Sequence, residues 1–245
     1  MSAPAIAAEG LGRAFDGKWA LRGLDLAVAP GEIYGFLGEN GAGKTTTLRM
    51  FAGLLRPSAG ELRIDGLTHA DAGRALRRRI GFLPDTPPLH DYLTGRQHLA
   101  LVASLWGVPR RLRDERGERL FDALGVTAHA DELCKGYSHG TRKKIHLAAV
   151  LATAPEVLLL DEPSSGLDPL SARRLKDLLL EQAAHGTTVF LSTHGLELAE
   201  QVCRRVGILA RGRLCAEGTP AELRARHGDR SLEDVFLAVT TGSAG

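Results

Sequence analysis

One stretch of the chain has the residue types and spacing that bind phosphate. Residues 38–45 have the sequence Gly-Glu-Asn-Gly-Ala-Gly-Lys-Thr, which fits the pattern G-x-x-x-x-G-K-[ST] at every fixed position. The glycines permit a tight backbone turn, so that N–H groups point into a concavity around phosphate oxygens. Lys44 supplies a point charge for the β- and γ-phosphates, and Thr45 supplies a hydroxyl for Mg²⁺. The stretch therefore predicts a loop that binds a nucleotide.

The flanking residues predict the strand and the helix that such a loop requires. Residues 32–37 form a short, mostly apolar run that predicts a buried strand. After the loop, Leu48, Phe51, Ala52 and Leu55 recur at the spacing of one helix face. A strand, a glycine loop and a helix N-terminus together make an anion site from backbone alone. The alternative is a chance glycine-rich turn, and this context argues against it.

Three polar residues follow two further strand patterns. Residues 157–160 are a continuous apolar run, typical of a parallel strand that is buried on both faces. Asp161 at its end suits the acidic residue that holds Mg²⁺, usually through water. Glu162 is next, points elsewhere, and can orient an attacking water. Residues 187–192 predict another strand, and His194 just past it could hydrogen-bond a γ-phosphate, although taken alone it would be a surface or capping histidine.

The remaining chain alternates between strand and helix patterns. Further strands are predicted at 6–28 (two, around a turn at 15–18), 60–66, 80–84 and 206–216 (a hairpin), and helices at 99–106, 112–124, 145–152, 170–184 and 232–239, before a flexible end at 241–245. Strands that alternate with helices predict an α/β fold with a mostly parallel sheet. Ligands of such sheets bind beyond the carboxyl ends of strands. We therefore expect the phosphate loop, Asp161, Glu162 and His194 at one edge.

Composition and charge exclude several classes of protein. The chain of 245 residues is 44% hydrophobic, as is ordinary for a globular protein. No apolar run reaches the roughly 18–20 residues that span a bilayer, and the N-terminus lacks the pattern of a signal peptide, so we expect a cytoplasmic chain. A net charge of +2 is not the excess expected of a nucleic-acid binder. The basic clusters at 74–79, 110–113 and 142–144 are interpreted as solvated helix faces.

The cysteines do not indicate a disulfide framework or a zinc site. Cys134, Cys203 and Cys215 are odd in number, widely spaced and form no C-x-x-C pair. We expect ordinary buried or half-buried thiols.

In order and spacing, these motifs resemble the ATP-binding subunit of an ABC transporter, from about Ile6 to Val239. The matching pieces are the Walker A motif at 38–46, the Walker B motif at 158–162, the D-loop at 165–168, the switch histidine at His194 and the signature at 137–141. The resemblance also places Phe15 where that family stacks an aromatic ring on adenine. Taken alone, Phe15 would be a core residue.

The resemblance implies roles for individual residues. It assigns catalysis to Lys44, Glu162 and His194, metal binding to Thr45, Asp161 and Asp85, and nucleotide binding to Phe15, Gly38, Glu39, Asn40, Gly41, Ala42, Gly43, Lys44, Thr45, Thr46, Asp85 and Asp168, with Ser138 and Gly140 acting in trans. The implied cofactors are ATP and Mg²⁺.

Two motifs depart from the family pattern, at three positions. In the signature, His139 replaces the first glycine and Thr141 replaces the glutamine, while Ser138 and Gly140 are kept. Asp85 stands where the family has the glutamine of the Q-loop. A carboxylate accepts from water or approaches Mg²⁺, but it cannot donate as an amide does. It is also one methylene shorter, so we expect a longer or water-mediated contact between Asp85 and Mg²⁺.

The implied fold is a P-loop NTPase with a RecA-like core, an antiparallel β subdomain and a helical insertion. We expect a single ABC ATP-binding domain over residues 5–240, with a core at 5–84 and 154–225, a helical subdomain at 86–153 and a short tail at 226–245.

The implied activity is Mg-dependent ATP hydrolysis by a head-to-tail dimer. Each ATP would lie between the phosphate loop of one chain and the signature of a second copy or a related chain. The helical insertion would couple to a separate integral-membrane permease at the inner face of the membrane, and no nucleic acid is involved. Residues 93–95 and the tail at 232–236 are similar to those of multidrug or antibiotic exporters. The alternatives are an ABC-type ATPase unconnected with transport, acting on ribosomes or DNA, and a weakly hydrolysing regulator.

Overall fold

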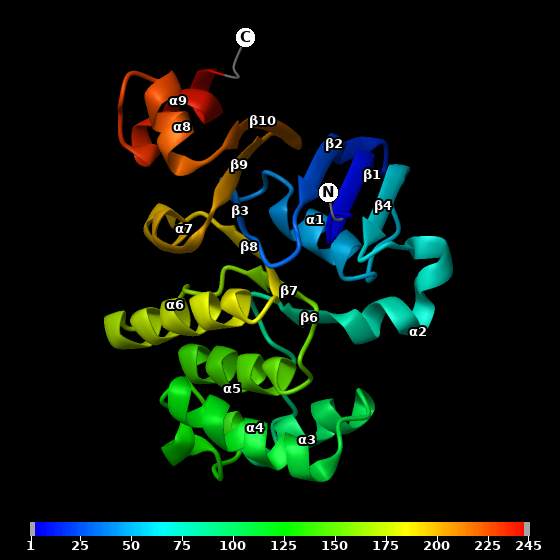
Figure 1. Ribbon diagram of the computed structural model, residues 1–245, viewed down its shortest axis with the longest axis vertical. Coiled ribbons are helices and arrows are strands. Elements are labelled where there is room, and N and C mark those ends of the chain that lie inside the picture. The colour runs from blue at the N-terminus through cyan, green and yellow to red at the C-terminus, as the bar shows by residue number, and fades with distance from the viewer. Residues whose placement is uncertain (1–2, 243–245) are drawn as a thin grey trace.

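The computed structural model describes residues 3–242, except for the side chains of residues 69–72 and 74. Two sheets form its centre, in the orders β2-β1-β4-β5 and β10-β9-β3-β8-β7-β6. Helices α3, α4 and α5 lie together at one end of the molecule, and α8 and α9 lie at the other (Figure 1). This arrangement confirms the mixed α/β fold expected from the sequence.

The smaller sheet is antiparallel. It consists of β1 (Ile6–Phe15), β2 (Lys18–Val28), β4 (Ala59–Ile64) and β5 (Leu67–Thr68). The predicted turn between β1 and β2 is confirmed, because Asp16 and Gly17 both have positive φ angles, of 47° and 78°. Two such residues make the turn whose twist matches a hairpin.

The larger sheet is mostly parallel. It consists of β3 (Ile33–Gly38), β6 (Ile80–Leu83), β7 (Val157–Asp161), β8 (Thr188–Thr193), β9 (Arg205–Ala210) and β10 (Arg213–Gly218). Only β10 pairs antiparallel in this sheet, as the predicted hairpin partner of β9.

Burial on both faces explains the apolar runs in the central strands. In β7, Leu158 and Leu160 pack into the core shared with the helices, while Val157 and Leu159 pack into the core beneath the antiparallel sheet. Side chains alternate between the faces of a strand, so a strand between two cores has no polar face.

Helices cover the larger sheet and form the insertion. They are α1 (Lys44–Phe51), α2 (His69–Arg79), α3 (Gly95–Leu105), α4 (Arg110–Ala123), α5 (His139–Leu151), α6 (Pro169–Ala184), α7 (Leu196–Val202), α8 (Pro220–Arg226) and α9 (Leu232–Gly242), with short 3₁₀ turns at Thr127–His129 and Cys134–Gly136.

Two helix boundaries differ from the prediction. Helix α1 ends at Phe51, so Leu55 lies outside it. The cause is Gly53, whose φ of 69° is left-handed and terminates the helix. Helix α9 continues to Gly242, through part of the end expected to be flexible. Residues 243–245 lie outside the described part of the chain.

One alternative and two predictions about burial were wrong. Phe15 is not a core residue, because 44% of its surface is exposed at the hairpin turn. Cys215 is exposed, whereas Cys134 and Cys203 are buried as expected. The cluster at 142–144 is not a solvated face, since Lys143 is 1% exposed. Of the cluster at 74–79, the side chain of residue 74 lies outside the description.

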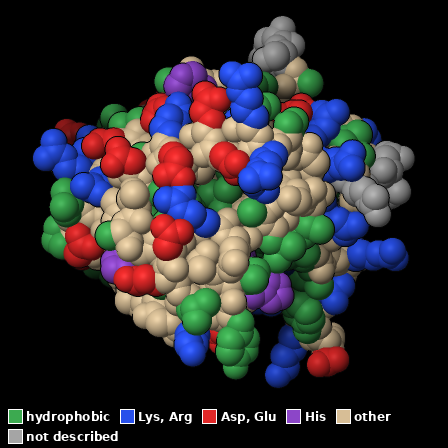
Figure 2. All heavy atoms as spheres, turned by 90° about the horizontal axis from the view of Figure 1, so that it is seen from below, with side chains coloured by type: hydrophobic (Ala, Val, Ile, Leu, Met, Phe, Trp, Pro, Cys, Tyr) green, Lys and Arg blue, Asp and Glu red, His purple; other side chains and the backbone are tan. Residues whose placement is uncertain are grey.

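Charged side chains of both signs are mixed on the surface. On the face seen from below, near α3 to α5, acidic and basic groups lie beside each other (Figure 2). Such a face does not provide the single-signed patch that binds a phosphate backbone.

A buried histidine pair joins α3 to α5. His98 Nε2 and His146 Nδ1 are 3.1 Å apart, and both rings are buried. Burial lowers the pKa of each to about 4, with smaller effects from His90 and Arg142 at His98 and from His98 at His146. The pair is therefore neutral and hydrogen-bonded near neutral pH.

This pair predicts a loss of stability in mild acid. Below pH 6.5 the unfolded chain takes up protons on both histidines, while the folded chain stays neutral down to about pH 4. The unfolded state then binds more protons, so the free energy of unfolding should fall by about 1.4 kcal/mol per pH unit for each histidine. Urea unfolding across this window measures it. A variant with His98→Gln and His146→Gln should have a shallower slope, and equal slopes would contradict the assignment.

Candidate nucleotide-binding site

The phosphate loop connects β3 to α1 in the predicted order. Gly41 and Gly43 have φ angles of 83° and 112°, a region that favours glycine. A Cβ at Gly43 would overlap the carbonyl oxygen of Ala20, and one at Gly38 would lie 2.7 Å from that of Leu209. The loop therefore needs glycine both for its turn and for its close approach to neighbouring backbone.

Lys44 is held across the loop. Its side chain is 6% exposed, and Nζ donates to the carbonyl oxygens of Gly38 at 2.6 Å and Glu39 at 3.2 Å. Nζ also lies 3.5 Å from Glu162 Oε1. The ammonium is thus held against the main chain of the loop.

Thr45 and Asp161 meet although they are far apart in sequence. Thr45 Oγ1 donates to Asp161 Oδ2 at 2.8 Å, and Ser192 Oγ donates to Asp161 Oδ1 at 2.8 Å. Asp161 is 2% exposed. Within the described residues, no group of three or more His, Cys, Asp or Glu side chains could hold a metal by itself. A hydroxyl and a carboxylate fit Mg²⁺, which takes few protein oxygens and completes its shell with phosphates and water.

Glu162 lies at the centre of the polar groups. Its Oε2 is 2.9 Å from His194 Nδ1 and accepts from Thr193 Oγ1 at 3.1 Å. The backbone N–H of His194 donates to Oε1 at 3.1 Å. With Lys44 beside Oε1, the carboxylate is surrounded by donors at the carboxyl ends of β7 and β8.

Lys44, Thr45 and Glu162 line a cavity of about 230 Å³, whereas Asp161 and His194 contact these residues from outside its lining. Its lining is Ala20, Glu39, Asn40, Gly41, Gly43, Lys44, Thr45, Thr46, Asp85 and Glu162. The structure therefore brings Asp85 and Glu162 to the phosphate loop, as the sequence analysis expected. Ser138, Gly140, Asp168 and Phe15 are not part of this lining.

The signature residues begin α5 instead. Ser138 caps the helix, because its Oγ accepts from the backbone N–H of Thr141 at 3.2 Å. Its hydroxyl also pairs with that of Thr141 at 2.9 Å. Gly140 is tightly packed, since a Cβ there would lie 2.9 Å from the carbonyl oxygen of Gly166.

Asp168 and Phe15 likewise have contacts within the chain. Asp168 caps α6 by accepting from the backbone N–H of Ser171 at 2.9 Å. Its hydrogen bond from the Ser171 hydroxyl lowers the pKa of Asp168. The Arg13 guanidinium lies over the ring of Phe15, 4.7 Å from its centroid. An exposed aromatic ring at this turn is available for stacking on its other face.

The sequence analysis missed Lys143. Its ammonium is buried beside the site, where it contacts Asp85 and the main chain of Glu162. One signal was available: residues 145–152 are almost continuously apolar, which predicts a helix buried on all sides rather than one with a solvated face.

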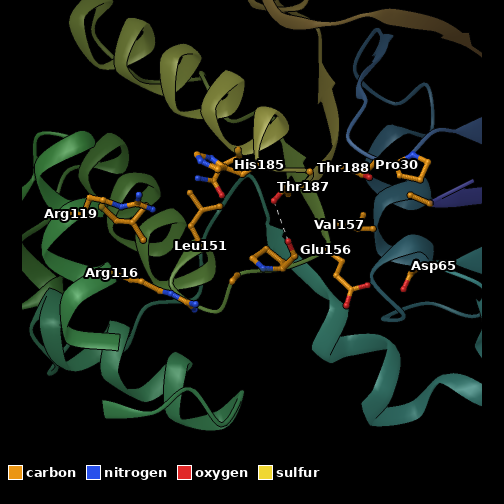
Figure 3. Close-up of a pocket in the computed structure, with 16 residues that line it drawn as sticks. Pro30, Asp65, Arg116, Arg119, Leu151, Glu156, Val157, His185, Thr187 and Thr188 are labelled. Atoms are coloured by element: carbon orange, nitrogen blue, oxygen red, sulfur yellow. Dashed lines mark hydrogen bonds between the residues drawn. The ribbon is translucent and has the colours of Figure 1, made fainter. Parts of the chain in front are cut away.

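A second cavity, of about 520 Å³, lies at the opposite end of the central strands. Val157 and Thr188, the first residues of β7 and β8, line it together with Arg116, Arg119 and His185 (Figure 3). Ligands of parallel sheets bind at carboxyl ends, whereas these are amino ends. This cavity is therefore not the nucleotide site.

A phosphate loop at the end of a parallel sheet, with a facing aspartate and glutamate, defines a P-loop ATPase. Residues 21–165 match the ABC transporter family, and the chain belongs to it. It is an ABC-type ATP-binding subunit, an enzyme that hydrolyses ATP.

Curated relatives and solved structures agree with this family assignment. The chain is 39% identical to the daunorubicin/doxorubicin resistance ATP-binding protein DrrA of Streptomyces peucetius, over 93% of this chain and 69% of that protein. It is 40% identical to the daunorubicin resistance ATP-binding protein DrrA3 of Streptomyces coeruleorubidus, over 96% and 75%. A solved ATP-binding subunit of an ABC transporter has a TM-score of 0.91 and 31% identity, over 96% of this chain and 99% of that one. For cbiO1 of Clostridium perfringens, part of the transporter complex cbiONQ, the values are 0.80 and 29%, over 92% of each chain.

The fixed position of Lys44 predicts a large effect on nucleotide affinity. Lys44→Ala removes the one side-chain ammonium in the cavity lining, and it should weaken binding of a fluorescent ATP analogue by about tenfold or more, since charge-assisted contacts to phosphate are strong. Lys135→Ala, at an exposed lysine outside the cavity, is the control. Equal affinity in the two variants would contradict the assignment.

Proposed function

We propose that the chain hydrolyses ATP as one half of a head-to-tail dimer and powers export by a separate integral-membrane permease. The observation that carries the proposal is the meeting of Thr45, Asp161 and Glu162 beside the phosphate loop. These groups provide a metal site and a base for water, which phosphoryl transfer to water requires.

The chain's own groups divide the chemistry between them. Lys44 and the loop N–H groups stabilise negative charge that develops on the transferred phosphoryl group. Thr45 and Asp161 orient Mg²⁺, which when bound neutralises charge on the phosphate oxygens. Asp85 lines the same cavity, and its Oδ1 accepts from Lys143 Nζ at 2.8 Å.

Glu162 and His194 act on the attacking water and the γ-phosphate. Glu162 accepts a hydrogen bond from the water and takes its proton as the water oxygen bonds to the γ-phosphorus, while the bond from that phosphorus to the bridging oxygen breaks and ADP leaves. His194 hydrogen-bonds the γ-phosphate. To bind the water, the carboxylate of Glu162 gives up its 3.5 Å contact with Lys44. The Lys44 ammonium then contacts the phosphate.

The position of the signature supports a dimer. Ser138 and Gly140 begin α5, and neither lines the cavity over the chain's own phosphate loop. A second copy or a related chain in head-to-tail arrangement would complete the site with its Ser138 hydroxyl and the free N–H groups at the start of its α5. Helix N-termini of this kind bind anions.

Exposed apolar side chains of the helical insertion support a permease partner. Tyr92, Leu101, Leu105, Leu112 and Leu133 are exposed on or beside α3 and α4. No helix among residues 3–242 is long and apolar enough to cross a membrane. We propose a membrane-spanning chain as the partner and a drug-like compound as its cargo, because the relatives DrrA and DrrA3 are named for daunorubicin resistance.

The role of Glu162 predicts a variant that binds ATP but does not turn it over. Glu162→Gln keeps the size of the side chain and removes its basicity, so the affinity for ATP should be retained while kcat falls by about 100-fold or more. Phosphate release and nucleotide binding measure the two. Turnover at the wild-type rate would refute the role of Glu162. An equally slow wild-type protein would instead favour the weakly hydrolysing regulator.

Completion of the site in trans predicts rescue by mixing two inactive variants. Ser138→Asp keeps a good helix cap but places negative charge where the partner's phosphate would lie, and Lys44→Ala removes ATP binding. Each homodimer then lacks a complete site, whereas a mixed dimer keeps one. Equal mixing should restore about one quarter of the wild-type rate, because half the dimers are mixed and each has one of two sites.

The control for this experiment mixes two samples of the same variant, which should stay inactive. If mixed dimers form but the ATPase rate is not restored, the site is not completed in trans.

A further inference from the structure

A buried lysine outside the phosphate loop holds the main chain around Glu162. Lys143 Nζ donates to the carbonyl oxygen of Glu162 at 2.6 Å, to Asp85 Oδ1 at 2.8 Å and to the carbonyl oxygen of Ser165 at 3.2 Å. An ammonium has three donors, so each of its N–H groups has one partner. Only 1% of the Lys143 side chain is exposed, so these protein oxygens, rather than water, accept its hydrogen bonds.

Asp85 is the counter-charge of this ammonium. A buried charge is tolerated only when it is paired and hydrogen-bonded. Asp85 is the one carboxylate within ion-pair distance of Lys143 among the described residues, and its own side chain is half exposed. The glutamine that this family has at the position of Asp85 would leave the ammonium without that charge. An aspartate at position 85, in place of the glutamine, therefore supplies the counter-charge that the buried ammonium of Lys143 requires.

The backbone of Glu162 has an unusual conformation that needs support. Its φ angle is 48°, in the left-handed region that long side chains seldom adopt. Such residues persist where the surroundings over-determine them. Here the N–H of Glu162 donates to the carbonyl oxygen of Ser192 at 2.8 Å, and its carbonyl oxygen accepts from Lys143. Both peptide groups that flank the residue are thus fixed, and they direct its carboxylate to Lys44 and His194.

We propose that Lys143 is a positioning residue for ATP hydrolysis, and that Asp85 acts on turnover through Lys143 rather than through the metal. The ammonium fixes the conformation of Glu162 and the start of the 165–168 loop, and Asp85 holds that ammonium in place through the ion pair. This inference rests on the proposed role of Glu162 in activating water.

A set of variants tests the inference. Lys143→Met removes all three donors while keeping an unbranched side chain, Lys143→Arg restores the charge and donors, and Lys135→Met is the control at an exposed lysine. Lys143→Met should lower kcat by about 10- to 100-fold, because misplacement of a catalytic group by about 1 Å has that effect. Its affinity for an ATP analogue should stay within about threefold of the wild type, since Lys143 does not line the cavity. Lys143→Arg should recover part of kcat.

A double-mutant cycle separates the two roles of Asp85. Asp85→Asn alone leaves the buried ammonium unpaired and should lower both kcat and the melting temperature. In the Lys143→Met background, Asp85→Asn should lower kcat no further and should raise the melting temperature relative to Asp85→Asn alone, because no uncompensated charge remains. Circular dichroism melts provide this readout independently of activity, and all rates are measured below the lowest melting transition.

Specific outcomes would overturn the inference. Lys143→Met with the kcat of Lys135→Met, or with a weakened nucleotide affinity and an unchanged kcat, would show that Lys143 does not position Glu162. Losses of kcat that multiply in the double variant would show that Asp85 acts independently of Lys143. If Lys143→Met does not fold, kcat and nucleotide affinity are measured instead in Lys143→Arg and in the double variant with Lys143→Met and Asp85→Asn, which has no charge at either position. A wild-type protein without ATPase activity would refute the proposed function instead.

Discussion

The register of three neighbouring parallel strands is the constraint on which the site depends. β8 lies between β3 and β7, with Thr193 paired to Leu37 and Ser192 paired to Asp161. This pairing brings the phosphate loop, Asp161 and His194 to one edge of the sheet, although Thr45 and Asp161 are 116 positions apart. The strands are buried on both faces, and a slip of one residue would exchange the side chains between the two cores. Packing therefore determines where the chemical groups lie.

Two buried ammonium groups approach Glu162 from different sides. Lys44 contacts its carboxylate, whereas Lys143 contacts its carbonyl oxygen. Both ammonium groups also donate to other main-chain carbonyl oxygens, which restricts the conformations that each side chain can adopt. Inside a protein such contacts are stronger than in water, because the local dielectric constant is lower. The same burial makes the removal of one partner costly, so the groups around Glu162 form a unit rather than a set of independent contacts.

Much of this arrangement was predictable because its signals are local. The glycine spacing of residues 38–45, the apolar run at 157–160 and the turn at Phe15 each require only a few neighbouring residues, and each is confirmed as an element. Helices α7 and α8 were missed because they are short, and α2 was anticipated only as the helix face at 74–79. Helix α1 was predicted too long because Gly53 outweighs the periodicity of the apolar positions.

Lys143 could not be paired with its carboxylate from the neighbouring sequence. It lies in a basic run, and its partner Asp85 is 58 positions away. A run of charged residues indicates a solvated face only if no carboxylate from elsewhere in the chain pairs with it. For Lys143, this depends on how α5 packs against the sheet. The exposure of Phe15 is similar, since a hairpin pattern does not reveal how far the turn extends beyond the sheet.

The cap at the start of α5 has a consequence for the order of the helix itself. Ser138 uses its hydroxyl to satisfy the N–H of Thr141, one of the donors that every helix leaves open at its first turn. A phosphate bound there by a partner chain would take those donors, and its negative charge suits the positive end of the helix dipole. Each nucleotide would then serve as the N-cap of a helix in the other subunit. Helix order and subunit association would become linked equilibria, so that ATP loss weakens both together.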